Sequence, residues 1–195
     1  LEWRDTMLTA LSSTSREPAR ALKEWLQSPE APKSFEERQK FAEDLLRGAK
    51  GEPDGKVLMA DASGKVRVET FADVKARLDA GKAFIGELSK GKTPPPREIQ
   101  EALLWRAALQ AGKSPADVRA DLAYAVEQFP KLREEIQGLP KDLSKDLALR
   151  FLSGEVTFFQ AKQFTATYRQ AKANAEKLGI SSEQFDTLIQ KQAQQ

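Results

Sequence analysis

Apolar side chains recur at helical spacing through the N-terminal part of the chain. Residues 2–48 contain three such stretches, each bounded by residue types that start or stop a helix. The second begins at Pro18, and the third begins at Ser34, whose hydroxyl can pair with the amide of Glu37 in a capping box. The pattern therefore predicts three helices that pack as one antiparallel unit.

Residues 56–69 are the one stretch with strand character. Two β-prone runs, 57–59 and 66–69, flank a polar turn that ends at Gly64. An isolated hairpin is only marginally stable in water, so we expect this one to pack against helices. The alternative is that its exposed edge receives a strand from a partner protein.

Helical spacing returns at Thr70 and continues to the C-terminus. The helix that starts there is expected to end at Gly81, because glycine is a common helix stop, and a short helix should follow over residues 82–89. Further helices are predicted between Pro96 and Gly112, Ser114 and Phe129, Pro130 and Gly138, Leu143 and Gly154, Thr157 and Leu178, and from Ser181 onward.

The segment 157–178 is the longest of these predicted helices. Small and apolar residues repeat along it at intervals of three and four, at Ala161, Phe164, Tyr168, Ala171, Ala175 and Leu178. Because alanines allow a neighbouring helix to approach closely, we expect an antiparallel helix pair here. Together the patterns predict a mostly α, multi-helix bundle of about eight to ten helices with one small β-hairpin near residues 56–69. We expect a single domain over residues 1–195 that can divide into an N-terminal lobe, 1–93, and a C-terminal helical lobe, 94–195.

The charge balance limits the classes of partner. The 195 residues include 31 Lys and Arg against 29 Asp and Glu, whereas a nucleic-acid binder normally concentrates a basic excess. No apolar run reaches the length of a membrane span, so we expect a soluble, intracellular protein. Binding to a membrane surface would need a basic amphipathic helix. The candidate cluster of cations is predicted to lie mostly on a loop and consists of Lys82, Lys90, Lys92 and Arg97. The sequence therefore predicts a protein partner rather than nucleic acid or membrane.

The chain contains neither cysteine nor histidine. This excludes disulfides, thiol catalysis and imidazole-based acid–base chemistry, as well as the metal ligands most common in zinc sites. Any catalysis would depend on carboxylates, Lys, Tyr, Arg or hydroxyl groups. We therefore expect no metal and no cofactor.

One segment matches a phosphate-binding loop in full, with Gly86, Gly91, Lys92 and Thr93 at the required spacing. A working loop needs a strand before it and a helix that starts at Gly-Lys-Thr. Here helix-like residues precede the motif and three prolines follow it at 94–96, which favours a linker before a proline-initiated helix.

An enzyme that acts on a nucleotide or a phosphorylated substrate is the alternative function. It would use the 86–93 loop or surface carboxylates, and the neighbouring acidic pairs are Glu36 with Glu37, Glu43 with Asp44, Glu134 with Glu135, and Asp142 with Asp146. Since these acids fall on the polar faces of amphipathic helices, solvation explains them without a catalytic role.

The helix around Trp105 is apolar on nearly all sides from Ala102 to Ala111, with Arg106 and Gln110 in a narrow polar stripe. Such a helix is either central to a fold or part of an interface. The leading hypothesis is a non-catalytic helical module that binds another protein through a helix face or groove. Its candidate contacts are Trp105, Arg106, Gln110, Arg67 and Glu69.

Overall fold

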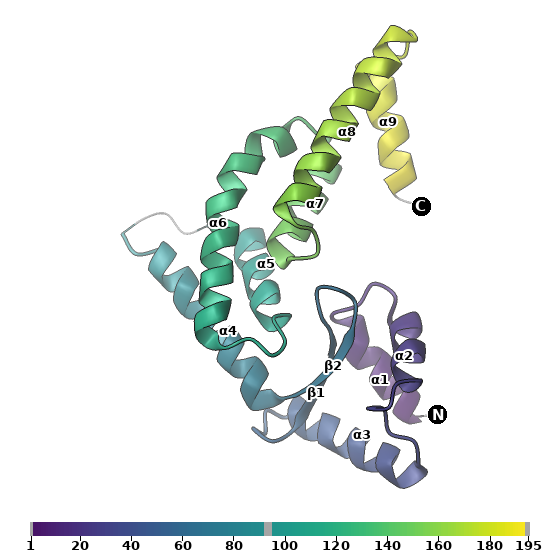
Figure 1. Cartoon of the computed structure of the whole chain (residues 1–195), viewed down its shortest axis with the longest axis vertical. Helices are drawn as coiled ribbons and strands as arrows, with labels where there is room; N and C mark the ends of the chain where they lie inside the picture. Colours follow the sequence, from purple (N-terminus) through teal and green to yellow (C-terminus); the bar gives the residue numbers. More distant parts are fainter. Residues whose placement is uncertain (1, 92–94, 194–195) are drawn as a thin grey trace. The chain divides into compact units, whose positions relative to one another are not determined.

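The computed structural model describes residues 2–91 and 95–193. These residues form nine helices and one antiparallel two-stranded hairpin, which confirms the predicted mostly α fold (Figure 1). In chain order the elements are α1 (Glu2–Ser12), α2 (Pro18–Leu26), α3 (Phe35–Ala49), β1 (Lys56–Ala60), β2 (Val66–Thr70), α4 (Phe71–Leu88), α5 (Arg97–Ala108), α6 (Pro115–Gln137), α7 (Lys141–Ser153), α8 (Phe158–Lys177) and α9 (Ser182–Ala193).

The chain divides into two compact units. Unit 1 consists of Leu1–Pro95 and Leu103–Leu122, and unit 2 consists of Pro96–Ala102 and Ala123–Gln195. The divisions fall within α5 and α6, whereas the sequence predicted lobes of 1–93 and 94–195. That prediction remains to be tested.

One hydrophobic core cluster of unit 1 is built by α1, α2, α3 and the hairpin, whose positions Figure 1 shows. Its buried members are Met7, Leu11, Ala21, Leu22, Trp25, Ala31, Leu45, Leu58 and Val66. The Trp25 ring lies 5.4 Å from the Phe41 ring, so α2 and α3 meet through an aromatic pair. Ser34 caps α3 by accepting a hydrogen bond from the amide of Glu37, as predicted. The Glu37 carboxylate accepts from the amide of Lys33.

The hairpin pairs Lys56 with Thr70 at one end and Ala60 with Val66 at the other. The amide of Ala60 donates to the hydroxyl of Thr14, which follows α1, over 2.8 Å. This bond and the contacts of β1 with α1 and α3 give the hairpin the helical cover that the sequence predicted.

Helix α4 is continuous through Gly81, so the predicted stop at this residue and the separate helix over 82–89 are wrong. Gly81 is buried and has no positive φ, hence it is not a helix cap. A Cβ atom there would lie 3.0 Å from the Cβ of Ala107 and 3.5 Å from a methyl group of Leu104. The glycine allows α5 to approach α4 closely, a role that local sequence does not distinguish from a stop signal.

Helix α6 likewise runs through Pro130, which the sequence predicted to begin a new helix. The pyrrolidine removes one backbone donor but projects from an exposed position. Buried side chains on both sides of the proline, at Ala125, Leu132 and Ile136, hold the helix against its neighbours. Tertiary burial therefore overrides the local break.

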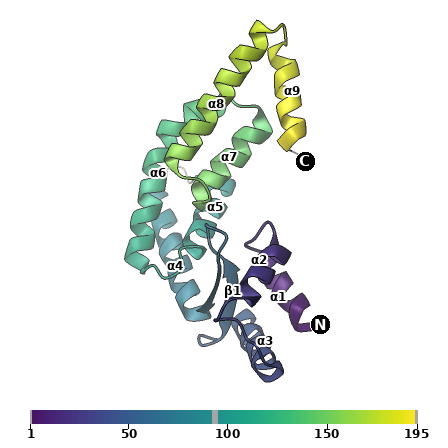
Figure 2. The same cartoon turned by 45° about the vertical axis from the view of Figure 1, so that its right-hand side comes forward.

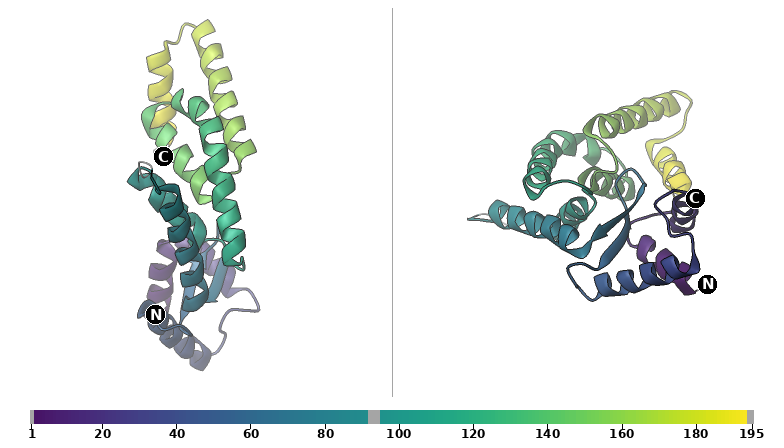
Figure 3. Two further views of the ribbon diagram at one scale, coloured as in Figure 1. Left: turned by 90° about the vertical axis from the view of Figure 1, so that its left-hand side faces the viewer. Right: turned by 60° about the horizontal axis from the view of Figure 1, so that its bottom comes forward.

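In unit 2, α8 turns sharply at Gly179 into the shorter α9, which Figures 2 and 3 show from two sides. Thr157 and Gln160 form a reciprocal capping box at the start of α8. Ser181 and Gln184 repeat the arrangement before α9. These two helix starts agree with the sequence prediction.

The predicted seam of α8 is correct in part. Ala161, Tyr168 and Ala175 are buried, but Phe164 is 43% exposed and Leu178 is 81% exposed. Thr165 is fully buried instead, where its hydroxyl donates to the carboxylate of Glu135 over 3.1 Å. The buried positions 161, 168 and 175 therefore keep the predicted seven-residue repeat, while the buried position between the first two is Thr165 instead of Phe164. Within the described ranges, no helix has the length and apolar character that a membrane crossing requires.

Candidate functional site

Two of the predicted contact residues lie on β2 and already have partners within unit 1. Arg67 is exposed, and its Nε donates to Asp61 in the hairpin turn over 3.1 Å. Burial opposes ionisation of Asp61, but hydrogen bonds from Ser63 and Arg67 outweigh it and hold the pKa of the carboxyl below its ordinary value. The pair therefore orders the turn.

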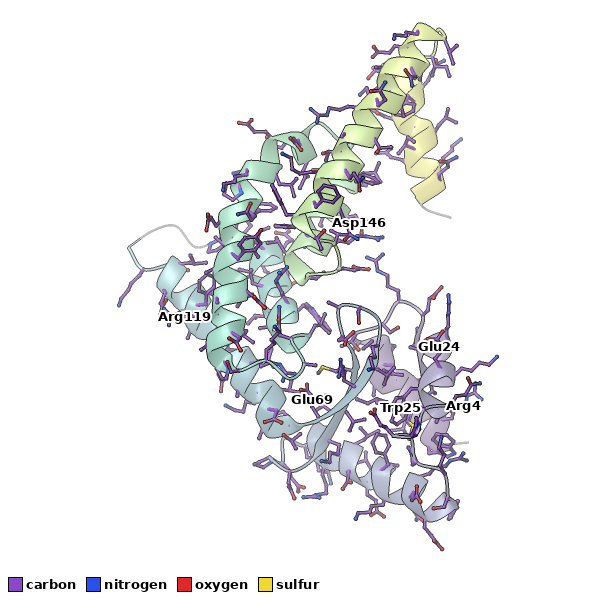
Figure 4. All side chains as sticks on the ribbon, in the orientation of Figure 1. Arg4, Glu24, Trp25, Glu69, Arg119 and Asp146 are labelled. Atoms are coloured by element: carbon purple, nitrogen blue, oxygen red, sulfur yellow. The ribbon has the colours of Figure 1, made fainter. Side chains whose placement is uncertain are left out.

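Glu69, labelled in Figure 4, binds the guanidinium of Arg77 on α4. The Arg77 side chain is 2% exposed and the Glu69 side chain is 12% exposed. One bond of the fork, from Nη1 of Arg77 to Glu69, measures 2.9 Å, and Nη2 of Arg77 also donates to the carbonyl of Ala108 over 3.1 Å. Glu69 in turn accepts from the amide of Gly112 over 3.2 Å. This network ties the hairpin to α4 and to the end of α5, which gives Glu69 a structural role.

The other predicted contacts lie on α5 or directly after it. Trp105 is 43% exposed, while Arg106 and Gln110 are half-buried. Burial lowers the pKa of Arg106, and the charge of Asp121 acts in the opposite direction. Glu69 accepts from the amide of Gly112, and its partner Arg77 donates to the carbonyl of Ala108 at the end of α5. The structure therefore places Glu69 close to the end of the helix that carries Trp105.

The phosphate-loop motif begins inside a helix. Gly86 lies in α4, so a helix rather than a strand precedes Gly91. Lys92 and Thr93 lie outside the described residues. This geometry lacks the strand that a phosphate-binding loop needs before its first glycine.

Several acids of the predicted pairs are bound to neighbouring side chains or amides. Asp44 pairs with Arg47, and Glu135 binds Thr165 and faces Lys162 at 3.9 Å. Asp146, labelled in Figure 4, pairs with Arg150 one turn along α7. Among the described residues, no three Asp or Glu side chains gather in a way that could hold a metal ion.

A polar cluster joins α8 to α9. The hydroxyl of Tyr168 donates to Asp186, and Lys172 donates to both, at 3.3 Å and 3.4 Å respectively. The Tyr168 ring also lies 5.7 Å from the ring of Phe185. Burial raises the pKa of Tyr168, the bond to Asp186 raises it further, and Lys172 opposes the shift.

This cluster predicts a high tyrosinate midpoint. In a Tyr124→Phe variant, Tyr168 is the remaining tyrosine, and absorbance titration should give a midpoint above 10.0 for the folded protein. Because folding raises this pKa, the linked stability is present below the unfolded pKa of about 10 and is lost as the pH rises through the folded pKa. Adding Asp186→Asn should lower the midpoint. A midpoint below 10.0 in the folded Tyr124→Phe protein would contradict the assignment.

A groove of about 500 Å³ lies between the end of α6 and the start of α7. Helix α6 contributes positions 129, 133, 136 and 137, and α7 contributes 141, 144, 145 and 148. Each set has the i, i+3, i+4, i+7 type of spacing that places residues on one helix face. Leu139, in the short connection, completes the lining.

The floor of the groove is apolar. Ile136 is 3% exposed and Leu139 is 6% exposed, and the half-buried Phe129 and Ala148 extend this surface. The Phe129 ring stacks on the buried ring of Phe151, with centroids 6.4 Å apart and an angle of 18° between planes. This stacking fixes the orientation of Phe129.

The rim of the groove is basic. Arg133, Lys141 and Lys145 are exposed, and none of the three forms an ion pair within the part of the chain that the structure describes. The lining includes no Asp or Glu. The acids Asp142 and Asp146 each lie one residue beyond a rim lysine, which places them roughly 100° further round α7.

None of the residues predicted to form a site lines this groove. In the sequence, the groove corresponds to two helical faces, Phe129 to Gln137 and Lys141 to Ala148, which are separated by a three-residue connection. Because the prediction started a new helix at Pro130, Phe129 and Arg133 were assigned to different helices, and their common face was not apparent.

No protein-family model matches the chain, and neither the curated proteins nor the solved structures include a significant match to it.

Proposed function

We propose that this protein is a non-catalytic helical module that binds another protein, and that the groove between α6 and α7 is the binding site. The observation that carries the proposal is the combination of an apolar floor and three rim cations that have no ion-pair partner among the described residues. Many proteins bind an amphipathic helix of a partner in an apolar groove between two of their own helices. A volume of about 500 Å³ is also in the range of pockets that bury a ligand group.

The floor of the groove is packed against other side chains of the same chain. The stacking of Phe129 on Phe151 and the burial of Ile136 and Leu139 hold its floor in place. A preformed floor reduces the entropy that is lost on binding, since fewer side chains must be immobilised. Trp105, Arg106 and Gln110 on the α5 side of unit 1 remain the alternative contact surface.

Photo-crosslinking in the native cells tests the proposal. A photoreactive amino acid is placed at Ser144 in the groove, at Trp105 on α5, or at the exposed Ala166 on α8 as a control. We expect a protein adduct of defined mass from position 144 and none from position 166. Adding Ala148→Arg, which fills the groove, should reduce the adduct by about tenfold or more, because the partner's anchor side chain can no longer enter, and a tenfold loss corresponds to about 1.4 kcal/mol.

Each outcome decides between the surfaces. An adduct from position 105 alone would move the binding site to α5. Adducts that are equal at positions 144 and 166, or that persist in Ala148→Arg, would exclude the groove. Absence of protein adducts from both 105 and 144 would reject the interaction module.

A further inference from the structure

We infer that the groove between α6 and α7 binds an acidic amphipathic helix of another protein. The inference rests on the proposed function and adds the chemistry of the partner. It follows from three features: the sign of the charge on the rim, the shape of the apolar floor and the orientation of α7.

The rim charge has one sign. Arg133 projects from α6, while Lys141 and Lys145 project from α7, so cations border the floor from both helices. No acid lines the groove, and none of the three cations is neutralised by an ion pair among the described residues. Such a rim attracts carboxylates and repels a cationic partner, which gives specificity and a faster association rate. Since the whole chain is close to neutral, at +2, this is a local field rather than a general basic character.

Helix α7 adds to the same field. It begins at Lys141 after Pro140, and no side chain caps its first turn; the one acid of that turn, Asp142, does not line the groove. The amide groups of a helix N-terminus carry a partial positive charge, and Lys141 lies in that turn. The groove therefore presents positive potential from the backbone as well as from its side chains.

The floor matches a helix in shape and chemistry. Phe129, Ile136, Leu139 and Ala148 form an apolar strip between two helical faces, and polar groups border it. An amphipathic helix presents apolar side chains at i, i+4 and i+7, which is the arrangement that fills such a strip. Acidic side chains on the flanks of that helix would then lie next to the rim cations.

Other anionic partners fit less well. Single-stranded nucleic acid needs exposed aromatic rings for base stacking, whereas Phe129 is half-buried and its ring is stacked on Phe151. A lipid surface is bound by a projecting amphipathic face, and this site is recessed between two helices. A second copy of the chain would have to supply an acidic apolar helix; the helix with an exposed Phe35 and Leu46, α3, carries three cations beside its four acids.

A panel of designed peptides tests the inference with the full-length chain. The first peptide is a helix of about 14 residues, about 21 Å long, with Leu at i, i+4 and i+7 and Glu on both flanks. The second replaces each Glu by Lys, and the third keeps the composition of the first but scrambles the Leu stripe. Fluorescence anisotropy should show binding of the acidic peptide at least about tenfold tighter than of either control, and a decline in affinity as salt screens the rim.

A charge-reversed protein provides the decisive comparison. Arg133→Glu with Lys141→Glu and Lys145→Glu should weaken binding of the acidic peptide by about 30-fold at low salt and create binding of the Lys peptide. The matched control reverses three exposed cations on α8 and α9, Arg169, Lys177 and Lys191, which gives the same net charge. It should retain the preference for the acidic peptide, and circular dichroism should show equal helix content in all three proteins.

Four results would overturn the inference: equal affinity for the acidic and Lys peptides, no binding of the acidic peptide, loss of binding in the matched control, or binding unchanged by the rim reversal. Anionic vesicles that bind the wild type more tightly than the acidic peptide does would indicate a lipid partner instead. A concentration-dependent molar mass that the rim reversal abolishes would indicate a second copy. If the Ser144 adduct forms but its partner binds without charge preference, the interaction module stands and the acidic helix is rejected.

Discussion

Replacing Glu69 by alanine is expected to lower the free energy of unfolding of unit 1 by about 3–5 kcal/mol, the range found when one partner of a buried ion pair is removed. The reason is that Arg77, at 2% exposed, would keep its charge in a buried site while losing both bonds of the guanidinium fork to Glu69. The amide of Gly112 would lose its acceptor as well. Urea denaturation followed by circular dichroism measures the change.

Two further variants separate the ion pair from a general effect of mutation. In the double variant Arg77→Met with Glu69→Leu, apolar side chains replace both charges, and much of the stability should return, because no buried charge is left unpaired. Asp79→Ala removes an exposed acid that pairs with Lys75 on the same helix, and should leave the denaturation midpoint nearly unchanged. A Glu69→Ala protein as stable as wild type would show that water replaces the lost carboxylate.

Introducing a single methyl group at Gly48 is expected to destabilise unit 1 by about 3 kcal/mol or more, at the upper end of overpacking costs. Gly48 is buried on α3, where a Cβ atom would lie 2.0 Å from the carbonyl oxygen of Lys56 and 2.8 Å from its carbonyl carbon. These are backbone atoms at the start of β1, so they cannot rotate away as a side chain could. The hairpin would have to separate from α3, and thermal denaturation should show the loss.

Gly86 provides the matched control. It also lies in a helix, α4, but it is exposed, and a Cβ atom there would meet nothing within 4 Å. Gly86→Ala should therefore stabilise the protein by about 0.5–1 kcal/mol, because alanine has the higher helix propensity. If Gly48→Ala and Gly86→Ala shifted the melting temperature in the same direction, close packing of α3 on β1 would not explain Gly48.

Local sequence was sufficient to predict most helix starts and the hairpin. Ser34, Thr70 and Ser181 were recognised as helix starts because a cap depends on a few neighbouring residues. The hairpin over residues 56–70 was recognised because β-prone runs and a glycine-ended turn are also local signals. The composition alone, with no Cys and no His, excluded thiol and imidazole catalysis.

Misassignments occurred where a residue's role depends on a distant partner. Gly81 was predicted to end a helix, but it lies within α4 and allows α5 to pack closely. Pro130 was predicted to start a helix, but α6 continues through it because Leu132 and Ile136 are buried. Glu69 remains a predicted partner contact, but its bonds within the chain, to Arg77 eight residues away and to the amide of Gly112, were not predicted. Neither pairing leaves a signature within a few residues of Glu69.

In this protein, the assignment of helices and strands follows from local sequence, because helix caps, turn residues and the spacing of apolar residues each involve only a few positions. The composition alone shows which catalytic side chains are absent. The groove between α6 and α7 could be identified only from the tertiary structure. Phe129 and Lys145 have ordinary roles on their own helices, as an apolar and a polar position. They border the same groove only because the connection at Leu139 folds α7 back on α6, and this packing is set by burial of the apolar faces of both helices.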